Sequence, residues 1–311
     1  TNLSNCLNRQ KGYQRLELSW LPDEYRLAAF HGDIEASMKN WDGMGKFDLA
    51  FNCKPQRFLK SGEEPIYIIP LVNGVKTTRL VSFQQYGTVI KLIKIPESGS
   101  VTFKINYLDS ATQEVVSVTL GTATEVGWTY VFERDFPAFD WWQIEAVLGQ
   151  NDNPDDLQFE LNTNYAWGNL DGEYERVTAI CGRSFDIENP TNFECRPIIE
   201  VNGAIFGIQS IKNYDVDGNE VERWNINCDD YSSVTTAAVI DCENEYFYYV
   251  DGGKKKNITG YMTIAHYDAH GDALLPSFPK MASGKTNIYS YLTYSAYEDV
   301  FIRLYPRWYT I

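Results

Sequence analysis

Short runs in which apolar and β-branched side chains alternate with polar ones recur through the chain, separated by clusters of Gly, Pro, Asn and Asp. Alternation with a period of two places every second side chain on one face of a strand, whereas a helix needs apolar residues three and four positions apart. Even spacing of such runs is typical of a β-sandwich or jelly roll. In the first part of the chain the runs are 66–72, 88–95, 101–107, 115–120, 128–132, 141–148 and 157–161.

A second set of runs follows a turn at Asn189-Pro190. The segment Asp217-Gly218-Asn219 separates two of them and predicts a tight hairpin. Aromatic residues make up 14% of the chain, and aromatic side chains suit a pleated, half-buried surface. We therefore expect a mainly β protein, with strands in 197–201, 204–211, 221–226, 235–240, 245–250 and 300–305.

Two segments interrupt this pattern near the N-terminus. In residues 5–20, Leu7, Leu16 and Trp20 lie at loosely helical spacing, so this segment is the best helix candidate. In residues 46–51, alternating apolar side chains predict a strand. Pro55 is then expected to end that strand at a sheet edge, because proline cannot donate to the hydrogen-bond ladder.

Charge and hydropathy exclude several partners. The chain has 311 residues and a formal net charge of −15, from 42 acidic and 27 basic residues. Such a surface repels phosphate backbones and anionic lipid, so we expect no nucleic-acid partner and no membrane insertion. No apolar run approaches the roughly 20 residues that span a bilayer, and no signal-peptide pattern precedes the first strand. We expect a soluble, unsecreted protein of two or three modules.

The chemistry-bearing residues form no recognisable catalytic or metal-binding motif. The chain has three His and contains no GxSxG, HExxH or P-loop string. The segment His266-Tyr267-Asp268-Ala269-His270 is expected to be a polar loop rather than a metal site. A glycosidase carboxylate pair cannot be identified from linear sequence. We expect no enzymatic activity, no cofactor, no metal, and free, mostly buried thiols at Cys6, Cys53, Cys181, Cys195, Cys228 and Cys242, which form no CxxC pair.

Four stretches in a fixed order carry a family resemblance. The first is GYQRLELSWLPDEYRLAAFHG (12–32) and the second is GKFDLAFNCKPQRFLKSGE (45–63). The third is NPTNFECRPIIEVNG (189–203). The fourth is IRLYPRWYTI (302–311), preceded by IDCENEYFYYV and SFPKMASGKTN. Together they resemble the distal tail proteins of long-tailed bacteriophages, which have an N-terminal ring-forming domain and a C-terminal galectin-like sandwich.

This resemblance implies a structural role at the virion tail tip, in a protein assembled in the bacterial host cytoplasm. The implied assembly is a homo-oligomeric ring, usually of six copies, whose N-terminal domains dock on the tail tube protein. The C-terminal domains would face the tail-associated tip protein and the receptor-binding protein.

The chain departs from the family pattern at two places. The family has further strands before the first stretch, so we expect an incomplete ring domain. About 120 residues also separate the second stretch from the third, where shorter members pass almost directly. We therefore predict three parts: the remainder of the ring domain (1–63), an inserted β-sandwich (64–184) and the galectin-like domain (185–311).

The insert is the candidate site for carbohydrate, because inserts in this family often resemble carbohydrate-binding modules. Sugar sites use flat aromatic faces, and the insert supplies Trp128, Tyr130, Trp141, Trp142 and Trp167. Alternation also places Trp128 and Tyr130 on one strand face, where sandwich core is the commoner use. The adjacent Trp141 and Trp142 must point to opposite faces, so one of them leaves that core for a ligand, a subunit contact or a covering loop.

The sequence thus favours a structural ring protein of the phage tail tip, with the insert as the candidate site for host cell-wall polysaccharide. The alternative is a carbohydrate-binding adhesin whose main role is recognition of the host surface.

Overall fold

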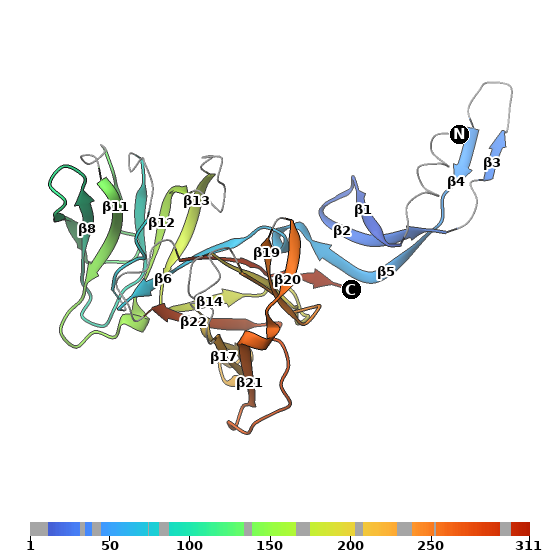
Figure 1. Cartoon of the computed structure of the whole chain (residues 1–311). Helices are drawn as coiled ribbons and strands as arrows, with labels where there is room; N and C mark the ends of the chain where they lie inside the picture. The colour runs from blue at the N-terminus through green and yellow to red at the C-terminus, as the bar shows by residue number, and fades with distance from the viewer. Residues whose placement is uncertain are drawn as a thin grey trace.

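The computed structural model describes residues 12–31, 35–38, 45–73, 75–80, 87–133, 139–165, 175–202, 208–228, 238–251, 253–292 and 300–311. Strands dominate these ranges, and the mainly β prediction is confirmed. Helical segments within them are short 3-10 turns: η1 (Lys60–Gly62), η2 (Pro154–Asp156) and η4 (Thr259–Tyr261). Figure 1 shows two sandwich modules lying side by side, with an arm that reaches away from them.

The first module is a sandwich of two sheets. One sheet has the order β10-β7-β12-β13-β6 and the other β11-β8-β9. Between them lies a hydrophobic cluster, the insert core, in which Phe103, Trp142 and Phe159 are fully buried. Its strands are β6 (Ile66–Val72), β7 (Val89–Lys94), β8 (Val101–Asp109), β9 (Val115–Ala123), β10 (Thr129–Val131), β11 (Phe139–Val147), β12 (Gln158–Tyr165) and β13 (Glu175–Gly182).

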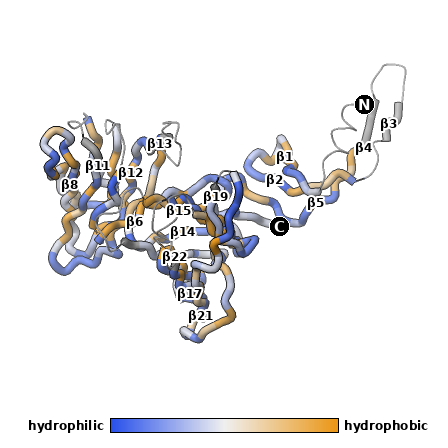
Figure 2. Tube along the Cα trace, viewed as in Figure 1, coloured by the Kyte–Doolittle hydropathy of each residue, from blue (hydrophilic) through white to orange (hydrophobic). Residues whose placement is uncertain are grey.

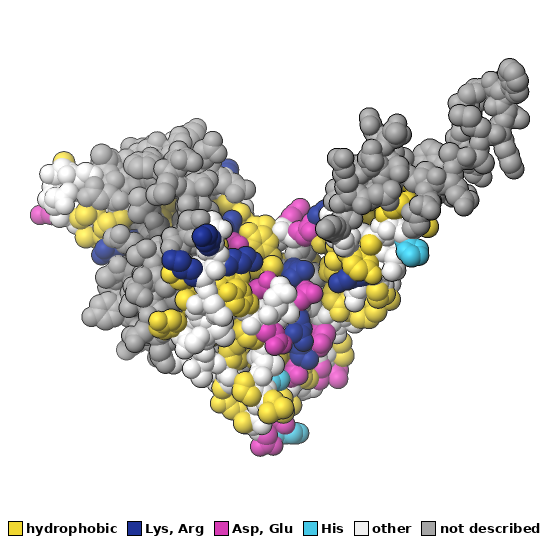
Figure 3. Space-filling view, turned by 45° about the vertical axis from the view of Figure 1, so that its right-hand side comes forward, with side chains coloured by type: hydrophobic (Ala, Val, Ile, Leu, Met, Phe, Trp, Pro, Cys, Tyr) yellow, Lys and Arg dark blue, Asp and Glu magenta, His cyan; other side chains and the backbone are white. Residues whose placement is uncertain are grey.

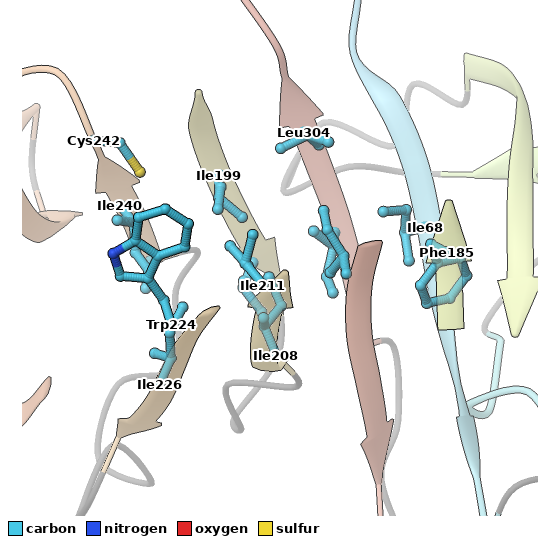
Figure 4. Packing of buried hydrophobic residues seen from close by; sticks show 14 of the residues in the cluster. Ile68, Phe185, Ile199, Ile208, Ile211, Trp224, Ile226, Ile240, Cys242 and Leu304 are labelled. Carbon is cyan, nitrogen blue, oxygen red and sulfur yellow. The ribbon is translucent and has the colours of Figure 1, made fainter. Parts of the chain in front are cut away.

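The second module is also a two-sheet sandwich. The ladder continues from β6 as β6-β23-β15-β18-β19-β20, and the facing sheet has the order β14-β22-β16-β17-β21. Ile199, Ile211 and Trp224 lie between the two sheets in what we name the C-terminal core (Figure 4). Its strands are β14 (Ser184–Glu188), β15 (Ile198–Asn202), β16 (Ile208–Tyr214), β17 (Glu220–Cys228), β18 (Ala238–Asp241), β19 (Tyr246–Asp251), β20 (Lys254–Asn257), β21 (Met262–Asp268), β22 (Lys285–Leu292) and β23 (Phe301–Tyr305).

Strand β6 belongs to both modules. Ile68 and Val72 point into the C-terminal core, whereas Ile69 and Leu71 point into the insert core. Successive side chains of a strand point to opposite faces, so one strand can close two cores. We name the two modules together the body.

The remaining strands form the arm. A four-stranded sheet has the order β1-β2-β5-β24, and beyond it lies a separate β3-β4 hairpin. Figure 2 shows hydrophobic stretches along the arm, yet of the described side chains between residues 12 and 59 only Ala28 is buried. The described arm thus has no hydrophobic core of its own. Its strands are β1 (Gln14–Leu18), β2 (Leu21–Phe30), β3 (Glu35–Met38), β4 (Gly45–Asp48), β5 (Phe51–Leu59) and β24 (Tyr309–Thr310).

The helix expected in residues 5–20 is wrong for its described part. Residues 14–18 form β1, which pairs antiparallel with β2. The sequence QRLEL also alternates, with Leu16 and Leu18 half-buried between exposed neighbours, and pairing with the long strand β2 favours the extended form. Residues 5–11 lie outside the described residues.

The expected strand end at Pro55 is also wrong. Strand β5 continues through Pro55 to Leu59, and its register against β2 shifts between Cys53 and Arg57. A bulge of this kind leaves a residue without a ladder bond, so proline is tolerated inside the strand. The strand expected over 46–51 is divided between β4 and β5, with Leu49 and Ala50 in neither.

The predicted hairpin at Asp217-Gly218-Asn219 is confirmed. It joins β16 to β17, and Gly218 has a positive φ of 84°, which glycine adopts without strain. The carboxylate of Asp215 accepts the backbone N–H groups of Asp217 and Asn219, both at 2.9 Å. These bonds close the turn.

Candidate functional site

Within the described residues, the arm is attached to the body at a joint formed by residues 59–63 and 307–310. The N–H of Leu59 donates to the carbonyl of Trp308 at 2.9 Å, and the N–H of Arg307 donates to that of Gly62 at 2.7 Å. Strand β24 then pairs with β5, with Tyr309 opposite Phe58. The last residues of the chain therefore hold the end of the arm.

Gly62 is required by the closeness of these two backbones. A Cβ at this position would lie 2.4 Å from the backbone N of Trp308, well inside van der Waals contact. Trp308 in turn packs against the C-terminal core. A glycine at this position thus lets the 3-10 turn η1 lie directly on a segment anchored in the body.

Aromatic side chains continue the joint on one side. Phe58 stacks on Tyr25 of β2 at 5.2 Å between ring centroids and lies 6.0 Å from Tyr309. Phe193, from the body, stacks on Tyr309 at 5.8 Å. Such ring pairs contribute about 0.5–1.5 kcal/mol each beyond their buried area. The row links arm and body without forming a closed core.

Ion pairs hold the β1–β2 hairpin against η1. Arg15 contacts Glu63 at 2.5 Å and Glu17 at 2.6 Å, and Lys60 contacts Glu17 at 2.8 Å. The hydrogen bond from Lys60, followed by that from Arg15, lowers the pKa of the exposed Glu17. Burial, together with a hydrogen bond to Glu63, raises the pKa of Tyr25. These exposed pairs set the orientation of the hairpin more than its stability.

The stretches that carry the family resemblance meet at this joint. The NPTNF loop is closed by Asn189, whose amide donates to the carbonyls of Phe193 and Ala282, each at 2.8 Å. Arg307 pairs with Glu243 of the segment IDCENEYFYYV at 3.0 Å. These segments are distant in sequence, yet they lie close together around the joint.

A polar groove of about 360 Å³ lies beside the joint. Lys54 and Gln56 of β5 line one wall, and Glu194, Glu243 and Arg307 of the body line the other. Figure 3 shows charged side chains of both signs on the body next to hydrophobic ones on the arm. The groove lies where arm and body diverge.

The tryptophan pair of the insert points to opposite faces, as expected. Trp142 is fully buried in the insert core. Trp141 is 8% exposed, and the Arg79 guanidinium lies 4.2 Å from the centroid of its ring. The Arg79 side chain thus covers Trp141, and the choice among a ligand, a subunit contact and a covering loop stays a prediction.

Trp128 and Tyr130 are half-buried at the side of the insert core. The Trp128 ring stacks on Phe103 with 5.3 Å between centroids and 7° between planes, and it lies 6.3 Å from Tyr130. Phe132 beside them is buried. Trp167 lies outside the described residues. Carbohydrate binding by Trp128, Tyr130, Trp141, Trp142 and Trp167 stays a prediction.

His266 does not lie in a polar loop, so that expectation is wrong. It belongs to β21 and is 8% exposed, with its ring stacked on Trp224 at 4.6 Å. Asp268 ends the strand and accepts the backbone N–H of His270 and of Asp272, both at 2.9 Å. The described residues contain no group of three side chains placed to hold a metal ion.

The described cysteines are free thiols. Cys181, Cys195 and Cys242 are buried as expected, whereas Cys53 is half-buried. Burial raises the pKa of all three buried thiols, that of Cys195 to about 12, so they stay protonated at neutral pH. The side chains of Cys6 and Cys228 lie outside the described residues.

None of the described helical segments is long and apolar enough to cross a membrane.

Comparisons with known proteins give two remote similarities. No protein-family model matches the chain. The LPS-assembly protein LptD of Shewanella oneidensis is 24% identical over 132 residues, 41% of this chain and 17% of that protein, so the chain spans about a sixth of this relative's length. A chain of the phage P2 baseplate in its activated conformation with Ca aligns over 89% of both chains, with 11% identity and a TM-score of 0.23. A TM-score this low does not establish a shared fold.

Proposed function

We propose that the chain is a structural, non-enzymatic component of a bacteriophage tail tip whose arm is completed by neighbouring copies. The observation that carries the proposal is the arm itself. Its four-stranded sheet buries a single described hydrophobic side chain, Ala28, while Trp20 is 73% exposed. Such a sheet needs packing from another element for independent stability.

The arm offers two places for a partner. Strand β24 covers β5 only at Arg57 and Phe58, and no described strand pairs with the same edge of β5 from Phe51 to Gln56. An exposed edge of this kind accepts a strand from another chain. Beside the sheet, Tyr13 before β1 and Trp20 in the turn between β1 and β2 are exposed and supply apolar area for the same contact.

In the finer form of the proposal, the copies close into a ring, usually of six. The arms dock on the tail tube protein, and the body faces the tail-associated tip protein and the receptor-binding protein. Closed rings follow when each copy presents one contact surface to the next copy and a different surface to the previous one. The resemblance of residues 12–32, 45–63, 189–203 and 302–311 to distal tail proteins supports this form, as does their convergence at the joint.

Mass photometry at micromolar concentration tests the proposal. We expect ring-sized particles for the wild type and a shift to monomer for Trp20→Glu, which places a charge on the open arm. The matched control is Val216→Glu, because Val216 is 95% exposed on the body. Wild-type protein that stays monomeric at every concentration contradicts the proposal.

A second candidate function is binding of host cell-wall polysaccharide by the insert, and in the adhesin alternative this is the main role. The half-buried state of Trp128 and Tyr130 favours it, since each ring keeps a solvent-facing part. Because β6 closes both cores, the test uses the whole chain in a pull-down on host cell walls. Trp128→Ala with Tyr130→Ala should abolish binding, and Tyr261→Ala, an exposed aromatic of the second module, should not. Retention by the double variant contradicts this candidate.

A further inference from the structure

A second groove, of about 580 Å³, crosses the outer face of the sheet β14-β22-β16-β17. Its volume lies within the about 300–1,000 Å³ of small-molecule sites. Side chains from all four strands line it, and Asp155 of η2 belongs to the insert module. The groove therefore lies where the two modules meet. Its lining shares no residue with the groove beside the joint and includes none of the described candidate aromatic residues of the insert.

The strand register fixes the groove side chains in rows. Ser210 lies opposite Asn225 on β17 and opposite Tyr289 on β22. Lys212 likewise lies opposite both Arg223 and Asn287. The other face of the same strands buries Ile211, Trp224 and Ile288 in the C-terminal core. The core side of the sheet thus holds a row of polar groups in place, as a preorganised site requires.

The charges of the groove are already balanced within the protein. Its lining includes two acidic side chains, Asp155 and Asp186, and two basic ones, Lys212 and Arg223. Arg183 pairs with Asp155 at 3.1 Å, Lys285 with Asp186 at 3.4 Å, and Glu220 with Lys212 at 3.2 Å. An ion entering the groove would compete with these pairs, so the electrostatics favour a ligand without net charge.

Polar side chains and aromatic rings also line the groove. Asn225 is exposed, and within the described part of the chain its amide has no hydrogen-bond partner. Tyr214 and Tyr289 add rings to the lining, and a cation of the protein already lies over each: Lys285 at 4.9 Å from the Tyr214 centroid and Arg183 at 5.6 Å from that of Tyr289. An amide offers both donors and an acceptor, and a ring packs against the apolar face of a ligand. The combination of a neutral site, mixed hydrogen-bonding capacity and tyrosine rings matches the chemistry of a sugar.

We infer that this groove binds a neutral oligosaccharide. The inference goes beyond the proposed assembly role and uses none of the residues of the arm. It also locates carbohydrate recognition on the second module, independently of Trp128 and Tyr130.

An array of immobilised oligosaccharides tests the inference with the full chain. The array carries neutral, uronic-acid-containing and amino-sugar oligosaccharides, so that ligand charge is varied separately. We expect binding to neutral members only. Absence of binding to any neutral member, or a preference for the charged ones, overturns the inference.

Two single substitutions on β17 then locate the site. Asn225→Ala should weaken binding roughly tenfold, as expected for loss of ligand hydrogen bonds. Asn227→Ala is the matched control, because Asn227 is exposed on the same face of the same strand but does not line the groove. Equal affinity of Asn225→Ala and wild type overturns the inference. Mass photometry of both variants should match wild type, which separates failure here from failure of the ring proposal.

Discussion

The arm and the body differ in how far they bury their hydrophobic side chains. Both consist mainly of antiparallel strands, although β6 of the body pairs parallel with β13 and β22. The body folds its sheets into two sandwiches with fully buried clusters, while the arm remains a single layer. Burial of apolar area contributes about 25 cal/mol per Å², so the body holds its stability within the chain. The arm, with Ala28 as its buried hydrophobic side chain among those described, depends on its joint and on what covers it. The difference indicates that regular strand pairing does not by itself make a region stable without a partner.

The largest expected effect contrasts one tryptophan in each region. Trp142→Ala should lower the free energy of unfolding by about 3–5 kcal/mol, because it leaves a large cavity in the insert core. Trp20→Ala should change it by less than about 0.5 kcal/mol in the monomer, because that side chain is exposed. Urea denaturation measures both. Equal costs at the two positions would remove the distinction between arm and body.

The next effect tests the sharing of β6 within the body. Ile68→Ala and Ile69→Ala should each cost about 2–5 kcal/mol, since both side chains are fully buried. Ile68→Ala should raise hydrogen exchange mainly in the second module, and Ile69→Ala mainly in the insert module, because the two side chains enter different cores. If both variants loosen the same module, the assignment of the two faces is wrong.

A smaller effect is expected at the joint. Gly62→Ala should cost about 1–3 kcal/mol, because the new Cβ forces apart two backbones that hydrogen-bond each other. The control is Gly260→Ala in η4, a 3-10 turn of the same length, where a Cβ meets nothing within 4 Å. Thermal unfolding and limited proteolysis after residue 59 report the two variants. Similar behaviour of both would show that the joint does not hold the arm.

The smallest effect is acid loosening of exposed carboxylates in the two regions. Hydrogen bonds from Ser98 hold the pKa of Asp152 in the body below its usual value, as those from Lys60 and Arg15 do for Glu17 in the arm. A lowered folded-state pKa contributes stability that is present above the unfolded value of about 4 and is lost as pH falls through the folded value. NMR titration of the carboxyl carbons gives both midpoints. Lys60→Ala should raise the midpoint of Glu17 and leave that of Asp152 unchanged; an unchanged Glu17 midpoint would show that Lys60 does not hold it.

The sequence predicts the body better than the arm for a physical reason. In the body, alternation is reinforced by burial, so runs such as 66–72 and 101–107 coincide closely with β6 and β8. In the arm, burial adds little, and the spacing of Leu16 and Trp20 predicts a helix although residues 14–18 pair as a strand. The strand end predicted at Pro55 is wrong because the bulge that accommodates proline depends on the register with β2.

Sites built from distant segments were not visible in the sequence. The joint brings Leu59 and Gly62 against Arg307 and Trp308, and no local pattern signals such a contact. The sequence also does not predict the groove on the second module. Asp186 alternates with apolar residues along its strand, as polar positions on an outer face do, but Lys212 and Asn287 each have a polar neighbour, Asn213 and Thr286. For the insert, adjacency alone showed that Trp141 and Trp142 diverge, but which of them enters the core depends on the pairing of β11 with β8.

The dependence of the arm on neighbouring copies is tested most directly by hydrogen exchange measured across a range of protein concentrations. If neighbours complete the arm, amides of β1, β2 and β5 exchange rapidly in dilute protein and become protected as rings form, while those of β6 and β23 are protected throughout. Strong protection of the arm in dilute monomer, equal to that of the body, would contradict the account.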